Sequence, residues 1–489
     1  MDHLRSIGLH VRNNFQSVAS SSEYREDIEL CPKDESNVSY TNSNHHKFQS
    51  SEKNGHVGPI PNNQDGTCSA NELPLSHTPE STGNSSTWQA GWNVANCMQG
   101  IGILSLPYTI KQGGLAALIS IAAVLFIGNY TSKILVQCLY EEEDIGNGKI
   151  RRTRVRNTYS DLADEMHKYG GTLLNIMQII DVTAVATLYL ELSGSLLVDT
   201  FPYAGISKLS WIVISTVILI PTIFFRNLTR IAWLSLIAVL SLIVMYFSVV
   251  WYSFGKSLMW DVSEIPPFEI QGFAVSSSII LFNFGTQFIM PGVEESMSNK
   301  SKFNIMVDIT YFITGVLNTS YAFFAYITFG DDTKEFITYN MPLGVLQALV
   351  SMLFVIKSLL SYPLMIFIVV SSLDAMHLSI LPPCYSSNPD KRPSLWAMIF
   401  RIVLVLFTLF LAIVIPHYTL LMGVTGSLTA PWLDFIFPCL FHLKLKWNRL
   451  TGTQVCMNIV VIFVALFGGM VGLLFSSKAL IQAYIKDFT

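Results

Sequence analysis

The first long apolar segment of the chain, residues 88–108, is interrupted in its middle. Gly100, Gly102 and Pro107 fall within eight residues of one another. Glycine weakens a helix interior, and proline removes a backbone donor and clashes with the preceding turn. At membrane depth, irregular backbone persists only where it is buried in protein or lines a cavity. The interruption therefore favours a binding site in this segment, with a kinked helix packed on its neighbours as the alternative.

Segments of similar length and character fill the rest of the chain. Of its 489 residues, 51% are hydrophobic and 13% are charged, whereas about 25% charged residues is usual in soluble domains. Many apolar runs reach the roughly 20 residues that cross a bilayer. The first fifteen residues hold no apolar core, so the first span is expected to direct insertion. We therefore predict an all-α polytopic membrane protein with eleven spans near residues 88–111, 114–140, 170–200, 209–225, 229–254, 270–293, 303–329, 343–372, 395–415, 417–441 and 453–476.

Residues 1–87 differ in composition from the spans, being rich in Ser, Asn, Pro and Gly with six Lys/Arg against eleven Asp/Glu. Such a segment buries too little apolar area to offset its ordering entropy, so we expect a disordered cytosolic tail. Its acidic stretch at 23–30 is a candidate sorting signal, and a solvated extension is the alternative. Residues 88–489 then form the transmembrane domain.

Basic residues in short loops predict the orientation of the spans, because cytosolic loops carry an excess of Lys and Arg. The loops after every second span hold Lys149, Arg151, Arg152, Arg154, Arg156, Arg226, Arg230, Lys300, Lys302, Lys391, Arg392, Lys444, Lys446 and Arg449. The other side holds Lys208, Lys256, Lys334, Lys478 and Lys486. This bias places the N-terminus in the cytosol and the C-terminus outside or in a lumen.

The sixth span repeats the interruption of the first. Gly285 precedes Pro291 by six residues, as Gly100 precedes Pro107 by seven. Two interrupted segments at matching places in two halves are the best sequence indication of an inverted-repeat transporter. We therefore expect two five-helix repeats, 88–254 and 270–441, followed by an eleventh helix.

The two breaks predict where a substrate binds. Half-helix N-termini offer unpaired N–H groups and a positive dipole end, which suit an anion such as an amino-acid carboxylate. The expected site residues are Gly100, Ile101, Gly102, Ile103 and Leu104 on one wall and Tyr189, Asn283, Gly285, Thr286 and Gln287 on the other.

Ionisable groups within the spans need a reason, since a charge at the bilayer centre costs about 2.5–3.5 kcal/mol on insertion scales. Lys357 lies mid-span with Ser361 one turn on, and Asp181 and Glu191 lie in the third span. These four are candidates for ion or proton coupling, with Lys357 as a fixed internal cation. A structural ion pair of Lys357 with Asp181 or Glu191 is the alternative. Glu294 is expected at the cytosolic boundary.

Several other functions are excluded or disfavoured. The net charge of −4 argues against nucleic acid as a partner. The seven cysteines are scattered, and their spacing predicts no metal or cofactor site and no disulfide framework. The longest loop outside the tail has under 30 residues, too short for a soluble catalytic domain, so we do not expect an enzyme.

Six strings of residues also carry a family resemblance. They lie at residues 91–94, 105–114, 139–142, 333–335, 357–363 and 416–429. In order and spacing they resemble the amino acid/auxin permease family, and most of all its members that load inhibitory amino acids into vesicles. The resemblance spans about 88–485, while 283–287 and 430–431 depart from the pattern.

The resemblance implies a leucine-transporter-like fold and residence in synaptic vesicles. It implies uptake of GABA or glycine by antiport against protons, driven by the gradient of a vacuolar ATPase, and it leaves chloride coupling open. A plasma-membrane or lysosomal amino-acid permease of broader specificity is one alternative. An amino-acid sensor that signals through the tail is another.

Overall fold

The computed structural model describes residues 83, 85–144, 150–221, 228–260, 265–376, 395–415 and 417–488. The predictions made for the tail at 1–82 and for its acidic stretch lie outside the described residues. Those made for Cys31, Cys68, Cys384, Lys149, Arg226, Lys391 and Arg392 lie outside them as well.

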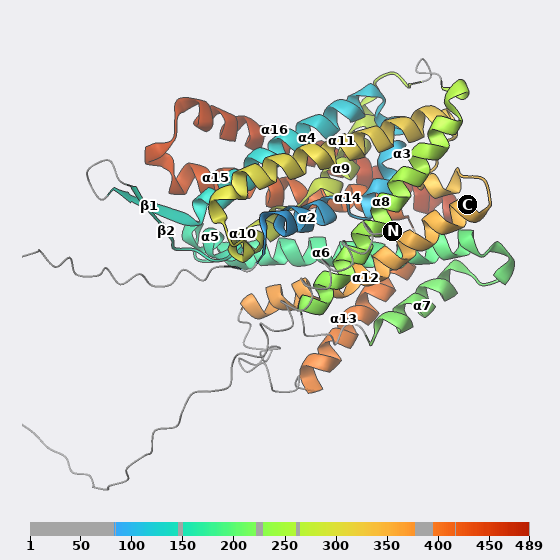
Figure 1. Cartoon of the computed structure of the whole chain (residues 1–489), viewed down its shortest axis with the longest axis horizontal. Helices are drawn as coiled ribbons and strands as arrows, with labels where there is room; N and C mark the ends of the chain where they lie inside the picture. The colour runs from blue at the N-terminus through green and yellow to red at the C-terminus, as the bar shows by residue number, and fades with distance from the viewer. Residues whose placement is uncertain are drawn as a thin grey trace, which may run out of the picture. The chain divides into compact units, whose positions relative to one another are not determined.

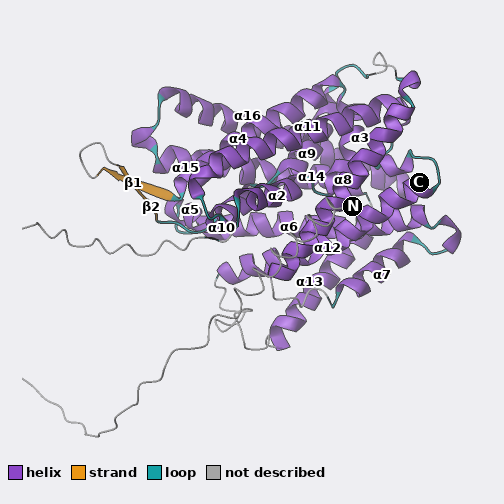
Figure 2. Cartoon of the chain, in the orientation of Figure 1, coloured by secondary structure: helices purple, strands orange, loops and turns teal. Residues whose placement is uncertain are grey.

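Most of the described chain is helical (Figures 1 and 2). The helices are α2 (Thr87–Met98), η1 (Ile101–Ser105), α3 (Leu106–Gly113), α4 (Leu115–Cys138), α5 (Tyr159–Met166), α6 (Gly170–Thr200), α7 (Lys208–Leu219), α8 (Leu228–Gly255), α9 (Ile270–Phe284), η6 (Gln287–Ile289), α10 (Met290–Ser296), α11 (Phe303–Phe329), α12 (Val345–Ala375), α13 (Leu395–Val414), α14 (Tyr418–Leu428), η10 (Pro431–Ile436), α15 (Phe437–Leu445) and α16 (Gly452–Phe488). Further short 3-10 turns join them, and the strands are β1 (Tyr140–Asp144) and β2 (Ile150–Arg154).

The predicted spans coincide with these helices. Within the described residues, eight helical segments are long and apolar enough to cross a membrane, and two shorter apolar helices lie at Lys208–Leu219 and Val239–Gly255. The remaining predicted span is the first, which is divided among α2, η1 and α3. The last helix, α16, runs 12 residues beyond the predicted end at 476.

Two long helices form the centre of the arrangement. α6 and α12 have 31 residues each and pack along one another. They are the third spans of the two predicted halves, so equivalent helices of the two repeats meet. The outward faces of the helices carry exposed large side chains, among them Phe126, Trp251, Phe312, Phe463 and Leu474. Apolar surface of that extent is expected to contact lipid.

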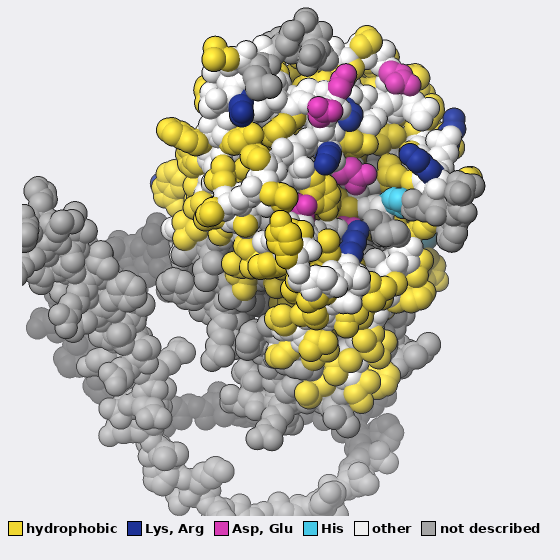
Figure 3. Space-filling model, turned by 90° about the vertical axis from the view of Figure 1, so that its right-hand side faces the viewer, with side chains coloured by type: hydrophobic (Ala, Val, Ile, Leu, Met, Phe, Trp, Pro, Cys, Tyr) yellow, Lys and Arg dark blue, Asp and Glu magenta, His cyan; other side chains and the backbone are white. Residues whose placement is uncertain are grey.

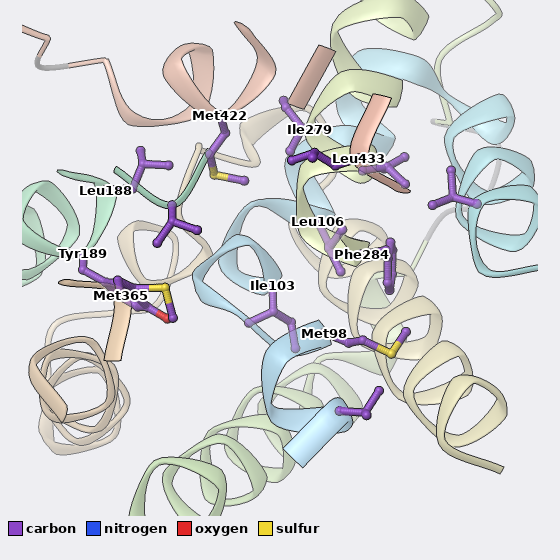
Figure 4. Close-up of a cluster of buried hydrophobic side chains, with 14 of the residues drawn as sticks. Met98, Ile103, Leu106, Leu188, Tyr189, Ile279, Phe284, Met365, Met422 and Leu433 are labelled. Carbon is purple, nitrogen blue, oxygen red and sulfur yellow. The ribbon is translucent and has the colours of Figure 1, made fainter. Parts of the chain in front are cut away.

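Buried apolar side chains surround the breaks in the first and sixth spans (Figure 4). Met98, Ile103 and Leu106 of the first span are each at most 1% exposed. Side chains from α9 and α14 lie beside them, including Phe284 and Met422. The irregular backbone is therefore enclosed in protein, as the cost of unpaired peptide groups in lipid requires.

A β-hairpin follows the second span and was not predicted. β1 and β2 are antiparallel, with Glu142 opposite Arg152 and Glu143 opposite Arg151. Opposite charges facing one another across strands stabilise such a pair. The hairpin gave no sequence signal because both strands consist mostly of charged residues and lack apolar alternation.

A short helix, α5, follows this charged stretch. Thr158 and Asp161 form a reciprocal capping box at its start. Burial alone would raise the pKa of Asp161, but hydrogen bonds from Thr158 and from the Asn157 backbone hold that pKa below its usual range.

The chain just before α2 is attached to the end of α10. The Ser85 N–H donates to the Ser296 carbonyl at 2.9 Å, and the Ser298 N–H donates to the Ser85 carbonyl at 2.9 Å. A Cβ on Gly83 would lie 2.2 Å from the same Ser296 carbonyl oxygen. Only glycine therefore permits this approach, which links the start of the first span to the end of the sixth.

The basic loops after α10 and α15 and the hairpin lie at one end of the helices (Figure 1). Lys446 donates to the Tyr140 carbonyl at 2.7 Å, and Arg449 pairs with Glu142 at 2.6 Å. The other end, seen in Figure 3, carries both basic and acidic side chains. There Lys111 donates to the Thr333 carbonyl at 3.0 Å, which ties the end of α3 to the loop before α12.

Candidate functional site

The first break separates α2 from the rest of its span. α2 ends at Met98, and Gln99 has φ −90° and ψ 46°, outside the helical region. A 3-10 turn, η1, follows and has no side-chain cap at Gly100. Pro107 lies in the first turn of α3, where a missing N–H costs nothing. The glycines and the proline thus act as the sequence predicted, by opening the helix and restarting it.

The second break has the same construction. α9 ends at Phe284, and Gly285 and Thr286 are extended or irregular. The turn η6 leads into α10, which carries Pro291 in its first turn. Both spans therefore consist of two half-helices joined by peptide groups that do not continue the helical backbone.

A cavity of about 290 Å³ lies against both breaks. Seven of the predicted site residues line it: Gly100, Gly102, Asp181, Tyr189, Asn283, Gly285 and Ser361. Its volume is at the lower end of the roughly 300–1,000 Å³ of small-molecule sites, so it suits a small solute.

The other lining residues were not among the predicted site residues. They are Asn93, Asn96, Cys97, Val182, Val185, Phe282, Phe288, Ile289, Val293, Leu364, Met365, Ile368, Ala430 and Asp434. The asparagines are uncharged, so the sequence does not single them out within an apolar helix. Asp434 is charged, and its position three residues after the helix-breaking Pro431 is the sequence signal that could have identified it as a site residue.

Seven predicted residues lie outside this lining. Ile103 and Leu104 are buried at 1% and 0% exposed, and the side chain of Ile101 is not among those described. Thr286 contacts the Tyr311 hydroxyl at 2.9 Å.

Gln287 donates to the Thr131 hydroxyl at 2.9 Å. Lys357 and Glu191 complete the seven. Gln287 and Thr286 anchor the second break to α4 and α11.

Lys357 binds the backbone at the first break and lies outside the cavity lining. The ammonium group, on a side chain 1% exposed, donates to the carbonyl of Gln99, the residue at the C-terminal cap of α2. A cation is favoured there because a helix C-terminus is the negative end of its dipole. The alternative of an ion pair between Lys357 and Asp181 or Glu191 is not observed among the described residues.

Glu191 has partners of its own. It pairs with Lys208 at the start of α7 and accepts a hydrogen bond from Ser195 at 3.1 Å. The carboxylate is buried at 1% exposed. This ion pair joins α6 to α7 away from the cavity.

Lining side chains from α6 and α12 meet at the cavity wall. Asp181 accepts from the Thr429 hydroxyl at 2.6 Å. Tyr189 of α6 lies beside Ser361 of α12. Ser361 faces the cavity. Lys357, one helical turn earlier, points to the first break instead.

Asn283 and Asp434 face the two glycines of the breaks. A Cβ on Gly102 would lie 2.5 Å from Asn283 Oδ1, and one on Gly285 would lie 2.7 Å from Asp434 Oδ2. Neither polar atom of the Asn283 amide has a hydrogen-bond partner, although the residue is 4% exposed. A buried amide without partners is costly, and a bound solute would satisfy it.

Glu294 closes the sixth span against the hairpin. Its buried carboxylate pairs with Arg154 at 3.0 Å and accepts from the Tyr140 hydroxyl. Arg154 also donates to the Pro291 carbonyl at 3.3 Å. Burial, together with the Glu294 carboxylate, raises the pKa of Tyr140. α10 is thus held by the same end of the molecule that carries the basic loops.

Within the described residues, no group of three or more His, Cys, Asp or Glu side chains could hold a metal ion. The cavity instead offers uncharged amides, two carboxylates and free peptide groups. Such a set can bind a small zwitterion without covalent chemistry.

Comparison with known proteins agrees with this geometry. Residues 83–482 match the family model described as transmembrane amino acid transporter protein. The vesicular inhibitory amino acid transporter of Xenopus laevis is 36% identical over 437 residues, covering 87% of this chain and 82% of that one. The vesicular GABA transporter of Caenorhabditis elegans is 30% identical over 404 residues, covering 81% and 80%.

Among solved structures, the inward-facing conformation of Mhp1 aligns with a TM-score of 0.51 at 13% identity, covering 85% of this chain and 96% of that one. At this identity the likeness concerns the fold alone. The predicted leucine-transporter-like fold of five plus five helices is confirmed. The chain is a transporter and not an enzyme. It belongs to the transmembrane amino acid transporter family, in which its relatives include the vesicular inhibitory amino acid transporters.

Proposed function

We propose that this transporter loads GABA or glycine into synaptic or other cytoplasmic vesicles by antiport against protons. The names of its relatives support the substrate class. The observation that carries the proposal is the small cavity between two helix breaks, with peptide groups on one wall and carboxylates on another. A zwitterion offers a carboxylate to the peptide N–H groups and an ammonium group to the carboxylates.

The substrate carboxylate binds at the first break. Gly100 begins a turn without a side-chain cap, and the first N–H groups of a helix have no partner within it. Gly102 and Asn283 lie in contact beside it, so the amide can bind the same carboxylate. Tyr189 supplies a hydroxyl from the facing helix.

Lys357 balances charge through the transport cycle. Its ammonium group occupies the carbonyl end of α2, a position where a bound cation would otherwise satisfy the freed peptide oxygen. Ser361, one turn after Lys357, and Asp181 line the cavity. Glu191 contributes through its ion pair with Lys208, which fixes α6.

The described conformation is open toward the cytosol in this proposal. The cavity extends along α2 and α10 through Asn93 and Val293, whereas Leu106 and Ile110 of α3 are fully buried. The basic loops lie at the α10 end, which by the charge rule is cytosolic. The N-terminus is then cytosolic and the C-terminus lumenal, and a vacuolar ATPase supplies the proton gradient.

Uptake of labelled GABA and glycine into acid-loaded proteoliposomes tests the proposal. We expect accumulation that collapses when a proton ionophore is added, with leucine as a poor competitor. Replacing chloride on one side at constant membrane potential shows whether chloride is coupled. Uptake unchanged without a proton gradient or membrane potential contradicts antiport. Equal uptake of many amino acids would favour a permease of broader specificity.

A further inference from the structure

Two carboxylates line one side of the cavity. Asp181 comes from α6, and Asp434 comes from η10, where it is 4% exposed. They act on each other electrostatically, and both act on Cys97 across the cavity. η10 is a π-helical turn between α14 and α15. Such turns are rare and occur often at functional sites.

Asp434 already occupies the half-helix N-terminus of the sixth span. The backbone N–H groups of Thr286 and Gln287 lie close to its carboxylate. The absent side chain of Gly285 lets Asp434 approach to contact. The anion at this break therefore belongs to the protein, and a substrate carboxylate has only the first break left.

Among the described residues, no salt bridge neutralises these two carboxylates. Lys357 donates instead to the Gln99 carbonyl and acts on Cys97. The other titratable groups that face Asp434 are Tyr159 and Tyr311. Thiols and phenols supply no positive charge. Two carboxylates in one enclosed site cannot both remain ionised cheaply, so the site favours one proton or one cation.

The Asn283 amide is a second and independent indication of a ligand. It lines the same cavity, is 4% exposed and has no hydrogen-bond partner on either polar atom. An amide can accept from an ammonium group and donate to a carboxylate, so it suits the middle of a zwitterion.

We propose that Asp181 and Asp434 form one cation site that holds either the ammonium group of the substrate or a proton, but not both. The proposal rests on the function proposed above and adds the mechanism of coupling to it. On the cytosolic side the arriving ammonium group displaces a carboxyl proton, which leaves to the solution. In an acidic lumen a proton returns to the carboxylate and the substrate is released. Mutual exclusion at one site is sufficient for antiport.

The site also selects substrates by their amine. Butyrate has the length of GABA without its ammonium group, so it is the matched probe. We expect Asp434→Asn and Asp181→Asn to raise the KM for GABA about tenfold to 100-fold, since charged hydrogen bonds are lost. The preference for GABA over butyrate should fall by a similar factor. Asp308→Asn is the control, because Asp308 pairs with Lys133 on the outer surface and its side chain is 53% exposed.

Proton dependence gives the second readout. In the wild type, acid on the cytosolic side should raise the KM for GABA without changing the maximal rate, as for a competing ligand. In the Asp434→Asn variant this dependence should be much weaker. The purified wild-type chain in weak buffer should release protons when GABA is added and none when butyrate is added, a measurement that needs no variant to fold.

The outcomes separate the two proposals. A wild type that takes up neither GABA nor glycine overturns the proposed function and this inference together. Uptake of GABA without proton release on binding overturns the inference alone. So does an Asp434→Asn variant that keeps the KM, the proton dependence and the GABA preference of Asp308→Asn.

Discussion

Adding one methyl group at Gly102 tests whether the first break and Asn283 form one site. The backbone at Gly102 does not have a positive φ, so alanine is compatible with its conformation. A Cβ there would lie 2.5 Å from Asn283 Oδ1 and 3.0 Å from Met422 Cε. Contact distances are about 3.5 Å, so Asn283 must move by about 1 Å.

The expected cost of this displacement is that of overpacking, about 1–3 kcal/mol. If the substrate binds only when Asn283 is in its described position, the binding free energy becomes less favourable by that amount. The KM for GABA should then rise about five- to 150-fold. The assay is uptake into proteoliposomes over a range of GABA concentrations, normalised to the amount of folded protein by size-exclusion chromatography.

Gly292→Ala is the matched control. Gly292 lies in α10, the half-helix that follows the second break, and a Cβ there would meet no atom within 4 Å. Alanine is the better helix former, so this variant should keep the wild-type KM and unfold at a slightly higher temperature. A Gly102→Ala variant with the wild-type KM would refute the assignment of Asn283 to the substrate site.

Three further predictions concern groups around the site. Lys357→Ala removes the buried donor to Gln99 and should abolish uptake while expression persists; normal uptake would remove Lys357 from the mechanism. Glu294→Gln removes the buried carboxylate that pairs with Arg154 and leaves only the half-exposed Glu295; it should destabilise this conformation by about 1–3 kcal/mol, so an unchanged unfolding temperature would contradict the pairing. Asp161 has a lowered pKa, so its contribution to stability is present above about pH 4 and is lost as the pH falls below that value. Asp161→Asn should remove this part of the pH profile, and profiles that coincide at all pH values would contradict it.

The sequence was sufficient for the helices and for the two breaks. Apolar runs long enough to cross a bilayer have few alternatives, and Gly100, Pro107, Gly285 and Pro291 interrupt them at matching places. The charged hairpin was not predictable in the same way, because its stability comes from cross-strand pairs such as Glu142 with Arg152.

The site was predictable only in part, and the limit is geometric. Sequence places a residue on a helix but does not say which neighbour its side chain meets. Lys357 could have paired with either of two acidic residues, and it binds a backbone carbonyl that has no sequence signature. Thr286 and Gln287 face other helices, while Asp434 reaches the second break from a distant segment.

The hydrogen bonds between Ser85 and residues 296–298 have a mechanical consequence. They make the start of α2 and the end of α10 one connected body, so the two half-helices on the cavity side of the breaks shift together. Residue 83, the first that the structure describes, belongs to this body. A force applied to the chain before residue 83 would therefore reach both half-helices at once.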